Sequence, residues 1–330
     1  MSACGYRTGV INDGSRSNWQ NSGARPIAWT AWYPSRRVAS SKQPEPGFFE
    51  SGDIVLDAPL TGISRLPVVL MSHGTGGRAE SLSWLARYLA KAGYVVLAAN
   101  HHGNTGLEPY TAEGFICWWE RASDLSFLLT QMSQDAFFGH RLDLDRVFAV
   151  GFSLGGYTVL TMAGAQTSLE EFQRWRTENG IADVGPREFP NVGSHVPGLI
   201  SSSAAFRASW ARSADDFTDS RLKKIAAIAP APPVRSFTRS SVAEIDLPVL
   251  LLTGGNDVEA PSEHCADWLM RQNNSFERVD LGREVGHYTF LEFPSNKELI
   301  GQEPLFTDHI TVDRVEVHNQ SSARIQAHFG

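Results

Sequence analysis

The chain has 330 residues, of which 42% are hydrophobic and 20% charged, and its net charge is −7. This composition is typical of a globular protein with a sizeable core, and no apolar run approaches the roughly 20 residues that a membrane-spanning helix requires. The negative charge, with Lys and Arg scattered along the chain, argues against nucleic acid as a partner.

Short β-branched runs alternate with helical patterns along most of the chain. This alternation is typical of βαβ units that build a mostly parallel sheet. Several of the predicted strands are apolar on successive residues, as strands covered by helices on both faces must be. The eight predicted strands are residues 27–33, 54–56, 66–72, 94–99, 147–152, 224–229, 249–253 and 276–281.

Leucines recur at helical spacing in residues 81–91 and 122–132, which predicts two helices that face the core. Residues 168–219 break the alternation: they hold EEFQRWRTENG, a Pro- and Gly-rich middle and SSSAAFRASWARSADDF. We expect helices joined by loops there, forming a cap inserted within a single domain of residues 1–330. Residues 312–329 are expected to form a closing helix.

The three cysteines, Cys4, Cys117 and Cys265, are widely spaced and include no CxxC pair. This odd number and spacing predict free thiols rather than a disulfide framework or a zinc site. The N-terminal residues MSACGYRTGV lack the basic start and apolar stretch of a signal peptide, so the chain as given is expected to be cytoplasmic. A secreted protein trimmed of its signal would have the same features.

The run VFAVGFSLGG at residues 147–156 joins a predicted strand to the start of a helix through the pattern G-x-S-x-G. A sharp turn between strand and helix lifts the central serine hydroxyl above the edge of the sheet, and the flanking glycines leave room for the strained backbone. The alternative is a chance occurrence of the pattern in a loop. The strand before it and the helical start after it favour Ser153 as a nucleophile.

A serine hydroxyl is a weak nucleophile and needs a base, which in turn is oriented by an acid. In the fold that carries this turn, the acid and then the histidine follow the serine along the chain, each after a strand. The run LPVLLLTGGND ends a predicted strand in a glycine turn that carries Asp257. Asp257 is therefore the first candidate for the acid, with Glu259 within reach of a similar position and a solvated acidic loop as the alternative.

After the next predicted strand, GREVGHYTFL places His287 in a glycine-flanked loop. It follows both the last strand and Asp257, as chain order requires of the base. The competing histidines in or near the predicted terminal helix are His309, His318 and His328. We predict His287 as the base.

Acyl transfer also needs donors aimed at the oxygen that becomes negative. The run LPVVLMSHGTGG at residues 66–77 is a predicted strand that ends in a glycine-rich turn, where this fold supplies its first donor. We expect the backbone N–H groups of Thr75 and Leu154 to form an oxyanion hole, with His73 bracing the turn. The spacings of phosphate-binding glycine loops are absent.

The run NHHGNT at residues 100–105 follows a predicted strand at the same edge of the sheet, so its side chains are candidates to face a pocket. Two adjacent histidines without a nearby third ligand do not predict a metal site, and no cofactor motif is present. Aromatic side chains further on suit a mostly apolar pocket, with an ordinary core role as the alternative. The pocket candidates are His102, Phe115, Trp118 and Trp119. Arg121 and Asp124 are expected to form a surface pair on a helix.

With these residues placed, the sequence resembles the predicted dienelactone hydrolase group related to platelet-activating-factor acetylhydrolases and to bacterial polyester-cleaving esterases. The resemblance runs nearly end to end and implies an α/β-hydrolase fold that hydrolyses esters or a related acyl bond without a metal. The motifs that carry it are AWYP at 31–34, SHGTGG at 72–77, AANHHGNTG at 98–106, ERASDLS at 120–126, GFSLGG at 151–156, GGND at 254–257, GHYTFL at 286–291 and VDRVEVH at 312–318.

Two departures from that group limit what the resemblance implies. Dienelactone hydrolases use a cysteine nucleophile where this chain has Ser153, so a dienelactone substrate is not implied. In the animal acetylhydrolases the acid follows the preceding strand, where this chain reads IAAIAPAPP at 225–233 without a carboxylate. That difference favours Asp257.

The sequence thus predicts an α/β-hydrolase fold with a mostly parallel eight-stranded sheet, helices on both faces and an inserted helical cap. The expected function is serine-dependent hydrolysis of a small or medium carboxylic ester through an acyl-enzyme, with Ser153, His287 and Asp257 and without a cofactor or metal. An amidase or another specialised acyl hydrolase would use the same residues. A catalytically silent ligand-binding protein of the same fold is the alternative from a different class. The sequence carries no indication of the oligomeric state.

Overall fold

The structure is a computed structural model that describes residues 2–36, 42, 44–45, 47–181 and 185–330. Its strands are β1 (Ser2–Ser17), β2 (Ala24–Arg36), β3 (Ile54–Leu56), β4 (Leu66–Ser72), β5 (Val95–Asn100), β6 (Leu142–Phe152), β7 (Leu222–Ile228), β8 (Val249–Thr253) and β9 (Glu277–Asp280). In this part of the chain they form one nine-stranded sheet in the order β3-β1-β2-β5-β4-β6-β7-β8-β9. Strands β4 to β9 are parallel, and β2 runs antiparallel to both of its neighbours.

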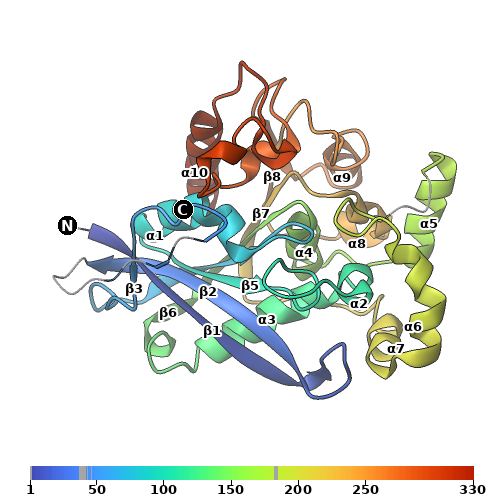
Figure 1. Ribbon diagram of the computed structural model, residues 1–330, viewed down its shortest axis with the longest axis horizontal. Helices are drawn as coiled ribbons and strands as arrows, with labels where there is room; N and C mark the ends of the chain where they lie inside the picture. Colours follow the sequence, from blue (N-terminus) through green and yellow to red (C-terminus); the bar gives the residue numbers. More distant parts are fainter. Residues whose placement is uncertain (1, 37–41, 43, 46, 182–184) are drawn as a thin grey trace.

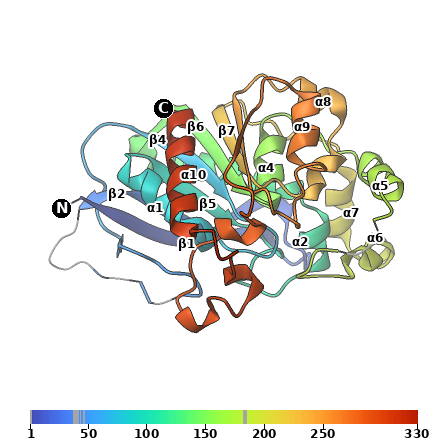
Figure 2. The same cartoon turned by 90° about the horizontal axis from the view of Figure 1, so that it is seen from above.

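Helices cover both faces of this sheet (Figures 1 and 2). The α-helices of the described residues are α1 (Ser83–Lys91), α2 (Ala112–Ile116), α3 (Glu120–Met132), α4 (Leu154–Met162), α5 (Leu169–Glu178), α6 (Val196–Ser202), α7 (Ala204–Ala211), α8 (Arg239–Ala243), α9 (Ala266–Gln272) and α10 (Arg314–Phe329). Side chains alternate between the faces along a strand. In β4, Val68 joins the core under α3 and α4, and Val69 joins the core under α1 and α10. The predicted α/β-hydrolase architecture is confirmed.

The ninth strand, β1, was not among the eight predicted strands, and the predicted strand number is therefore wrong by one. Its sequence is polar and contains glycines, which weaken a strand signal. In the antiparallel pair with β2, however, Gly5 lies opposite Tyr33 and Gly9 opposite Trp29. A β-carbon on Gly5 would lie 2.2 Å from the Tyr33 ring, so glycine is what lets this ring lie across β1.

The segment predicted as a cap, 168–219, contains α5, α6 and α7 and no strand in its described parts, 168–181 and 185–219. Residues 182–184 of the predicted cap lie outside the described residues. Ser168 explains the start of α5, because its side chain accepts a hydrogen bond from the N–H of Glu171. In Figures 1 and 2 the three helices lie together at one end of the molecule, on the side of α8 and α9.

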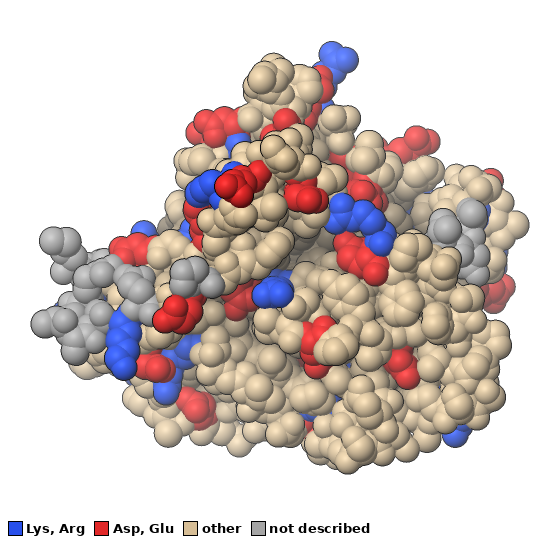
Figure 3. Space-filling view, viewed as in Figure 1, with Lys and Arg blue, Asp and Glu red and all other residues tan. Residues whose placement is uncertain are grey.

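The closing helix predicted at 312–329 is α10, which begins after Asp313, whose carboxylate accepts hydrogen bonds from two backbone N–H groups of the first turn. On the face shown in Figure 3, basic and acidic side chains are interspersed, and neither sign forms a stripe. Among the described residues, no helix is both long and apolar enough to cross a membrane. All three cysteines are buried free thiols, as predicted.

Candidate active site

Ser153 lies in a strained turn between β6 and α4. Its backbone has φ 55° and ψ −117°, a conformation that a residue with a β-carbon rarely adopts. The two glycines of the pattern are required here: a β-carbon on Gly151 would lie 1.9 Å from the Gly155 carbonyl oxygen, and one on Gly155 would lie 2.1 Å from the Ser72 carbonyl oxygen. The predicted strand, turn and helix around Ser153 are therefore all present.

Three side chains that are far apart in the sequence form one chain of hydrogen bonds at the carboxyl edge of the sheet. Ser153 Oγ lies 2.9 Å from His287 Nε2, and His287 Nδ1 lies 2.8 Å from Asp257 Oδ2. Asp257 follows β8, and His287 begins a short 3-10 helix after β9. All three side chains are buried.

Of the two acidic candidates, Asp257 is the one that bonds to the histidine. Its second oxygen, Oδ1, accepts hydrogen bonds from the N–H groups of Glu259 and Ala260 at 3.1 and 2.7 Å. These bonds fix the carboxylate so that Oδ2 points at His287. The Glu259 side chain is exposed.

The competing histidines lie elsewhere. His318 Nε2 is bonded to the Thr289 carbonyl oxygen at 2.9 Å, and His328 Nε2 to the Ile225 carbonyl oxygen at 3.1 Å. His309 is exposed and contacts Thr311. Of the histidines weighed from the sequence, His287 is the one that the fold brings to Ser153.

The glycine-rich turn after β4 passes directly beside Ser153, since a β-carbon on Gly74 would lie 3.2 Å from Ser153 Cβ. Two of its N–H groups are already used: Gly76 donates to Asn104 Oδ1 at 2.6 Å, and Gly77 donates to the Gly74 carbonyl oxygen at 3.2 Å. Thr75 lies between Gly74 and Gly76 in the turn, and Leu154 is the first residue of α4. Thr75 therefore follows the residue that lies beside Ser153, and Leu154 follows Ser153 itself.

His73 and Arg121 stabilise this turn by hydrogen bonds to its backbone carbonyl oxygens. His73 Nδ1 donates to the Gly74 carbonyl oxygen at 2.6 Å, its Nε2 accepts from the N–H of His101 at 3.3 Å, and Arg121 donates to the His73 carbonyl oxygen. Burial and the nearby Arg121 guanidinium hold the pKa of His73 well below its usual value, so the ring is neutral. The bracing role predicted for His73 agrees with these contacts.

Arg121 and Asp124 do not form the surface pair that the sequence suggested. They are 1% and 0% exposed, and Asp124 is bonded to Arg25, through Nε at 2.8 Å, and to His101 Nδ1, at 3.0 Å. Despite burial, Arg25 and the neighbouring Arg16 hold the pKa of Asp124 well below its usual value. The helical spacing of 121 and 124 was visible in the sequence, but the partner Arg25, which lies 99 residues from Asp124, was not.

Buried neutral histidines predict a loss of stability in acid. Burial lowers the pKa of both His101 and His318 to about 3 in the folded chain, against 6.5 for the unfolded chain. Between these values the unfolded chain binds more protons, so the free energy of unfolding falls as pH falls below 6.5, by about 1.4 kcal/mol per histidine at pH 5.5 relative to pH 7.5. Urea denaturation at the two pH values measures this.

His318→Gln is the matched variant for that experiment. Glutamine can still donate to the Thr289 carbonyl oxygen, to which His318 Nε2 is bonded. We expect this variant to show a smaller loss between pH 7.5 and 5.5 than the parent chain. Stability that is independent of pH over this range, or an unchanged loss in His318→Gln, would contradict the assignment.

The four predicted pocket residues support the loops around the site. His102 is bonded to Glu108 and to the Trp19 N–H, so both ring nitrogens are used. Phe115 packs on Phe189 at 5.4 Å between ring centroids. Trp118 packs on Phe172 of α5 at 5.4 Å, and the Trp119 indole N–H donates to Ser209 of α7. Phe115, Trp118 and Trp119 thus join the predicted cap to the rest of the molecule.

Arg187 and Glu188 lie close to the candidate site, and the sequence did not predict them there. A β-carbon on Gly76 would lie 2.9 Å from both Glu188 Cγ and Tyr110 Oη, so the chain around Glu188 reaches the glycine-rich turn. The Arg187 guanidinium lies 5.1 Å from the centre of the Tyr288 ring, next to His287. Burial and the nearby Glu259 raise the pKa of Glu188. No sequence signal marks Arg187 and Glu188, because the sequence around them has neither helical nor strand periodicity.

His287 also borders a cavity of about 150 Å³, together with Tyr288, Glu259 and Asp308. Within the described ranges, no three His, Cys, Asp or Glu side chains gather closely enough to hold a metal ion. The groups that the described residues bring together beside Ser153 are its hydroxyl, the His287 imidazole and the Asp257 carboxylate.

The fold and this arrangement of residues define an α/β-hydrolase. The chain belongs to the alpha/beta hydrolase family, whose sequence profile matches residues 68–297. A comparison with curated protein sequences finds no match.

Solved structures with the same fold include a ferulic acid esterase from Streptomyces cinnamoneus, with a TM-score of 0.65 and 19% identity over 99% of this chain and 89% of the esterase chain. Another is a protein from Klebsiella pneumoniae subsp. pneumoniae MGH 78578 that carries the provisional name dienelactone hydrolase. Its TM-score is 0.52 and its identity 14%, over 98% of both chains. At these identities the likeness concerns the fold.

Proposed function

We propose that this α/β-hydrolase is a serine-dependent carboxylic ester hydrolase that works through an acyl-enzyme. One observation carries the proposal: Ser153 Oγ, His287 and Asp257 form a continuous chain of hydrogen bonds of 2.9 and 2.8 Å. A hydroxyl bonded to an imidazole that is oriented by a carboxylate is the arrangement that activates serine for attack on a carbonyl carbon. The ferulic acid esterase with the same fold is a neighbour that acts on esters.

In the first half of the proposed reaction, His287 Nε2 takes the proton of Ser153 Oγ as the oxygen attacks the ester carbonyl carbon. The carbonyl oxygen becomes negative in the tetrahedral intermediate, where the N–H groups of Thr75 and Leu154 stabilise it. Asp257 holds the imidazole in the tautomer that accepts the proton and stabilises the imidazolium. The intermediate collapses, the alcohol leaves with the proton from His287, and the acyl group stays on Ser153.

In the second half, a water molecule gives a proton to His287 and attacks the acyl carbon. The second tetrahedral intermediate is held by the same two N–H groups. Its collapse releases the carboxylic acid, and the proton returns from His287 to Ser153 Oγ. The enzyme is regenerated, and the ester and water are the only reactants that the proposed steps require.

The segment 168–219 is proposed to act as the cap of a single-domain enzyme, limiting the size of the ester. Its loop around Glu188 lies against Gly76, and its helices pack on Trp118 and Trp119. Phe115, Trp118 and Trp119 are proposed to shape an apolar pocket, and His102 to hold the loop behind it. The proposed substrate is a small-molecule ester of small or medium size.

Turnover of an ester and its matching anilide tests the proposal. We expect hydrolysis of a short p-nitrophenyl ester and a kcat/KM at least about 100-fold lower for the p-nitroanilide of the same acid, because p-nitroaniline is a much poorer leaving group than p-nitrophenol and the amide therefore has the higher barrier. Preferred cleavage of the anilide would make the chain an amidase. Failure to hydrolyse either, over acyl chains of graded length, would favour a silent binding protein of the same fold.

A further inference from the structure

Arg121 lies on α3 and is buried with two of its three nitrogens unpaired. Nη2 donates to the His73 carbonyl oxygen and, at 3.3 Å, to Ser72 Oγ, whereas Nε and Nη1 have no hydrogen-bond partner among the described residues. Burial lowers the pKa of Arg121 to about 9, despite the nearby Asp124. A buried cation with unpaired donors is unfavourable for folding. The paired nitrogen, however, contacts the turn after β4 that passes beside Ser153.

The bonds of Arg121 and His73 fix two successive peptide units of that turn. Arg121 donates to the carbonyl oxygen of the His73–Gly74 unit, and His73 Nδ1 donates to the carbonyl oxygen of the Gly74–Thr75 unit at 2.6 Å. The N–H of Gly77 donates to the same Gly74 oxygen at 3.2 Å. A trans peptide unit is planar, and its N–H points away from its carbonyl oxygen. A fixed Gly74 carbonyl oxygen therefore fixes the direction of the Thr75 N–H as well.

A buried chain of hydrogen bonds orients the second acceptor of Arg121. Ser72 Oγ lies 2.9 Å from His101 Nε2, and His101 Nδ1 lies 3.0 Å from Asp124 Oδ2. Because the carboxylate can only accept, the neutral His101 ring carries its proton on Nδ1, and its Nε2 accepts the proton of the Ser72 hydroxyl. The Ser72 oxygen then presents a lone pair to Arg121. Asp124 thus helps, through two side chains, to hold the Arg121 guanidinium in place.

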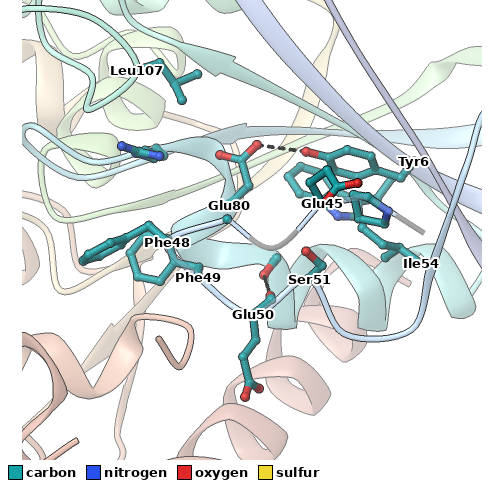
Figure 4. A pocket seen from close by; sticks show the side chains of 14 residues that line it. Tyr6, Glu45, Phe48, Phe49, Glu50, Ser51, Ile54, Glu80 and Leu107 are labelled. Carbon is teal, nitrogen blue, oxygen red and sulfur yellow. Dashed lines mark hydrogen bonds between the residues drawn. The ribbon is translucent and has the colours of Figure 1, made fainter. Parts of the chain in front are cut away.

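The far end of the same turn is held by different residues. Glu80, in the 3-10 helix Ala79–Leu82, accepts hydrogen bonds from Tyr6 Oη at 3.0 Å and Thr30 Oγ1 at 3.2 Å. Figure 4 shows the bond between Glu80 and Tyr6. These bonds tie the 3-10 helix to β1 and β2 and do not involve the Gly74–Thr75 peptide. Tyr6 therefore offers a matched control for Arg121.

We propose that Arg121 is a positioning residue of the hydrolytic site, which together with His73 holds the Gly74–Thr75 peptide so that the Thr75 N–H faces the oxyanion. This inference rests on the proposed function, since it concerns the oxyanion hole of that reaction. Arg121 acts through the turn and not on the substrate. It keeps the donor in place before the negative charge develops, which is how a preorganised donor lowers the barrier of the chemical step.

Arg121→Met tests the proposal in the full chain, because methionine fills the space without a charge or a donor. We expect kcat for a short p-nitrophenyl ester to fall about 10- to 100-fold with KM within about 3-fold of the parent value, since the donor acts on the transition state. The midpoint of urea denaturation is expected to stay at or above that of the parent chain, because the variant removes a buried charge and two unpaired donors.

Ser72→Ala is the milder second variant, since it removes one hydroxyl that orients Arg121. We expect kcat to fall about 3- to 10-fold, again with little change in KM. Should Arg121→Met fail to fold, Ser72→Ala decides by the same measurements.

A trifluoromethyl ketone inhibitor reports on the oxyanion hole separately. Ser153 Oγ adds to its ketone carbon, the serine proton passes to His287, and the ketone oxygen becomes an oxyanion without loss of a leaving group. We expect the inhibition constant to rise in Arg121→Met by about the factor by which kcat/KM falls. The control Tyr6→Phe removes the bond to Glu80 and is expected to lower the urea midpoint while kcat and the inhibition constant stay within about 2-fold.

A folded Arg121→Met variant with kcat and inhibition constant within about 3-fold of the parent values would overturn the proposal, as would a fall in kcat without a rise in the inhibition constant. An equal catalytic loss in Tyr6→Phe would also overturn it, because any loosening of the turn would then suffice. A parent chain that hydrolyses no ester is a separate result, which would contradict the proposed function itself.

Discussion

Replacing Ser153 by alanine is expected to lower kcat/KM for a short p-nitrophenyl ester by about 10⁴-fold or more. The variant keeps the backbone N–H groups around the turn but loses the nucleophile, and removal of a nucleophile of this kind leaves only the catalysis supplied by binding and by the oxyanion donors. Stopped-flow or steady-state release of p-nitrophenol measures the change.

The fold of the Ser153→Ala variant is expected to persist, because the serine side chain makes a single hydrogen bond to the described residues, the one to His287. Circular dichroism and the unfolding temperature provide the control. A variant that is folded and still hydrolyses the ester within about 10-fold of the parent chain would rule out Ser153 as the nucleophile.

Replacing Asp257 by asparagine is expected to lower kcat by about 10³- to 10⁴-fold with a smaller change in KM. The asparagine amide can donate to His287 Nδ1, which favours the tautomer with the proton on Nε2, and that tautomer cannot accept the proton of Ser153. The two N–H groups that bond to Asp257 Oδ1, those of Glu259 and Ala260, can still find an acceptor in asparagine. The defect should therefore concern the chemical step rather than folding.

Glu259→Gln is the matched control, since Glu259 is the second carboxylate of the same loop and is exposed. Its kcat is expected to stay within about 3-fold of that of the parent chain. The reverse pattern, with a large loss in Glu259→Gln and a small one in Asp257→Asn, would transfer the role of the acid to Glu259.

The parallel part of the fold was predictable because its signals are local. The residues VVLM of β4 and VLLL of β8 are buried on both faces, and the leucines of 81–91 and 122–132 lie on α1, on the 3-10 helix just before it and on α3. The strand β1 was not predictable in the same way. Its stability comes from pairing with β2 and from the rings of Tyr33 and Trp29, which pack over Gly5 and Gly9. A prediction made from the residues of one segment alone cannot include such partners.

In the candidate site, too, residues with a local sequence signal could be predicted, and residues that depend on distant partners could not. Ser153, Asp257 and His287 could be predicted because each follows a strand in a fixed chain order, and parallel strands bring their carboxyl ends to one edge. Arg121 could not, because its partner, the His73 carbonyl oxygen, lies 48 residues away. Glu188 was missed since its position depends on how the segment 168–219 packs on Gly76, and no short-range pattern encodes that packing.

Labelling with a fluorophosphonate tests most directly whether Ser153 is the residue that becomes acylated. Such a reagent loses fluoride and forms a stable phosphonate ester with an activated serine. Peptide mass spectrometry of the labelled parent chain is expected to find one adduct, on the peptide that contains Ser153, with matching loss of esterase activity and no adduct in Ser153→Ala. An unlabelled Ser153 in an enzyme that hydrolyses esters, or inactivation through an adduct on another residue, would contradict the account.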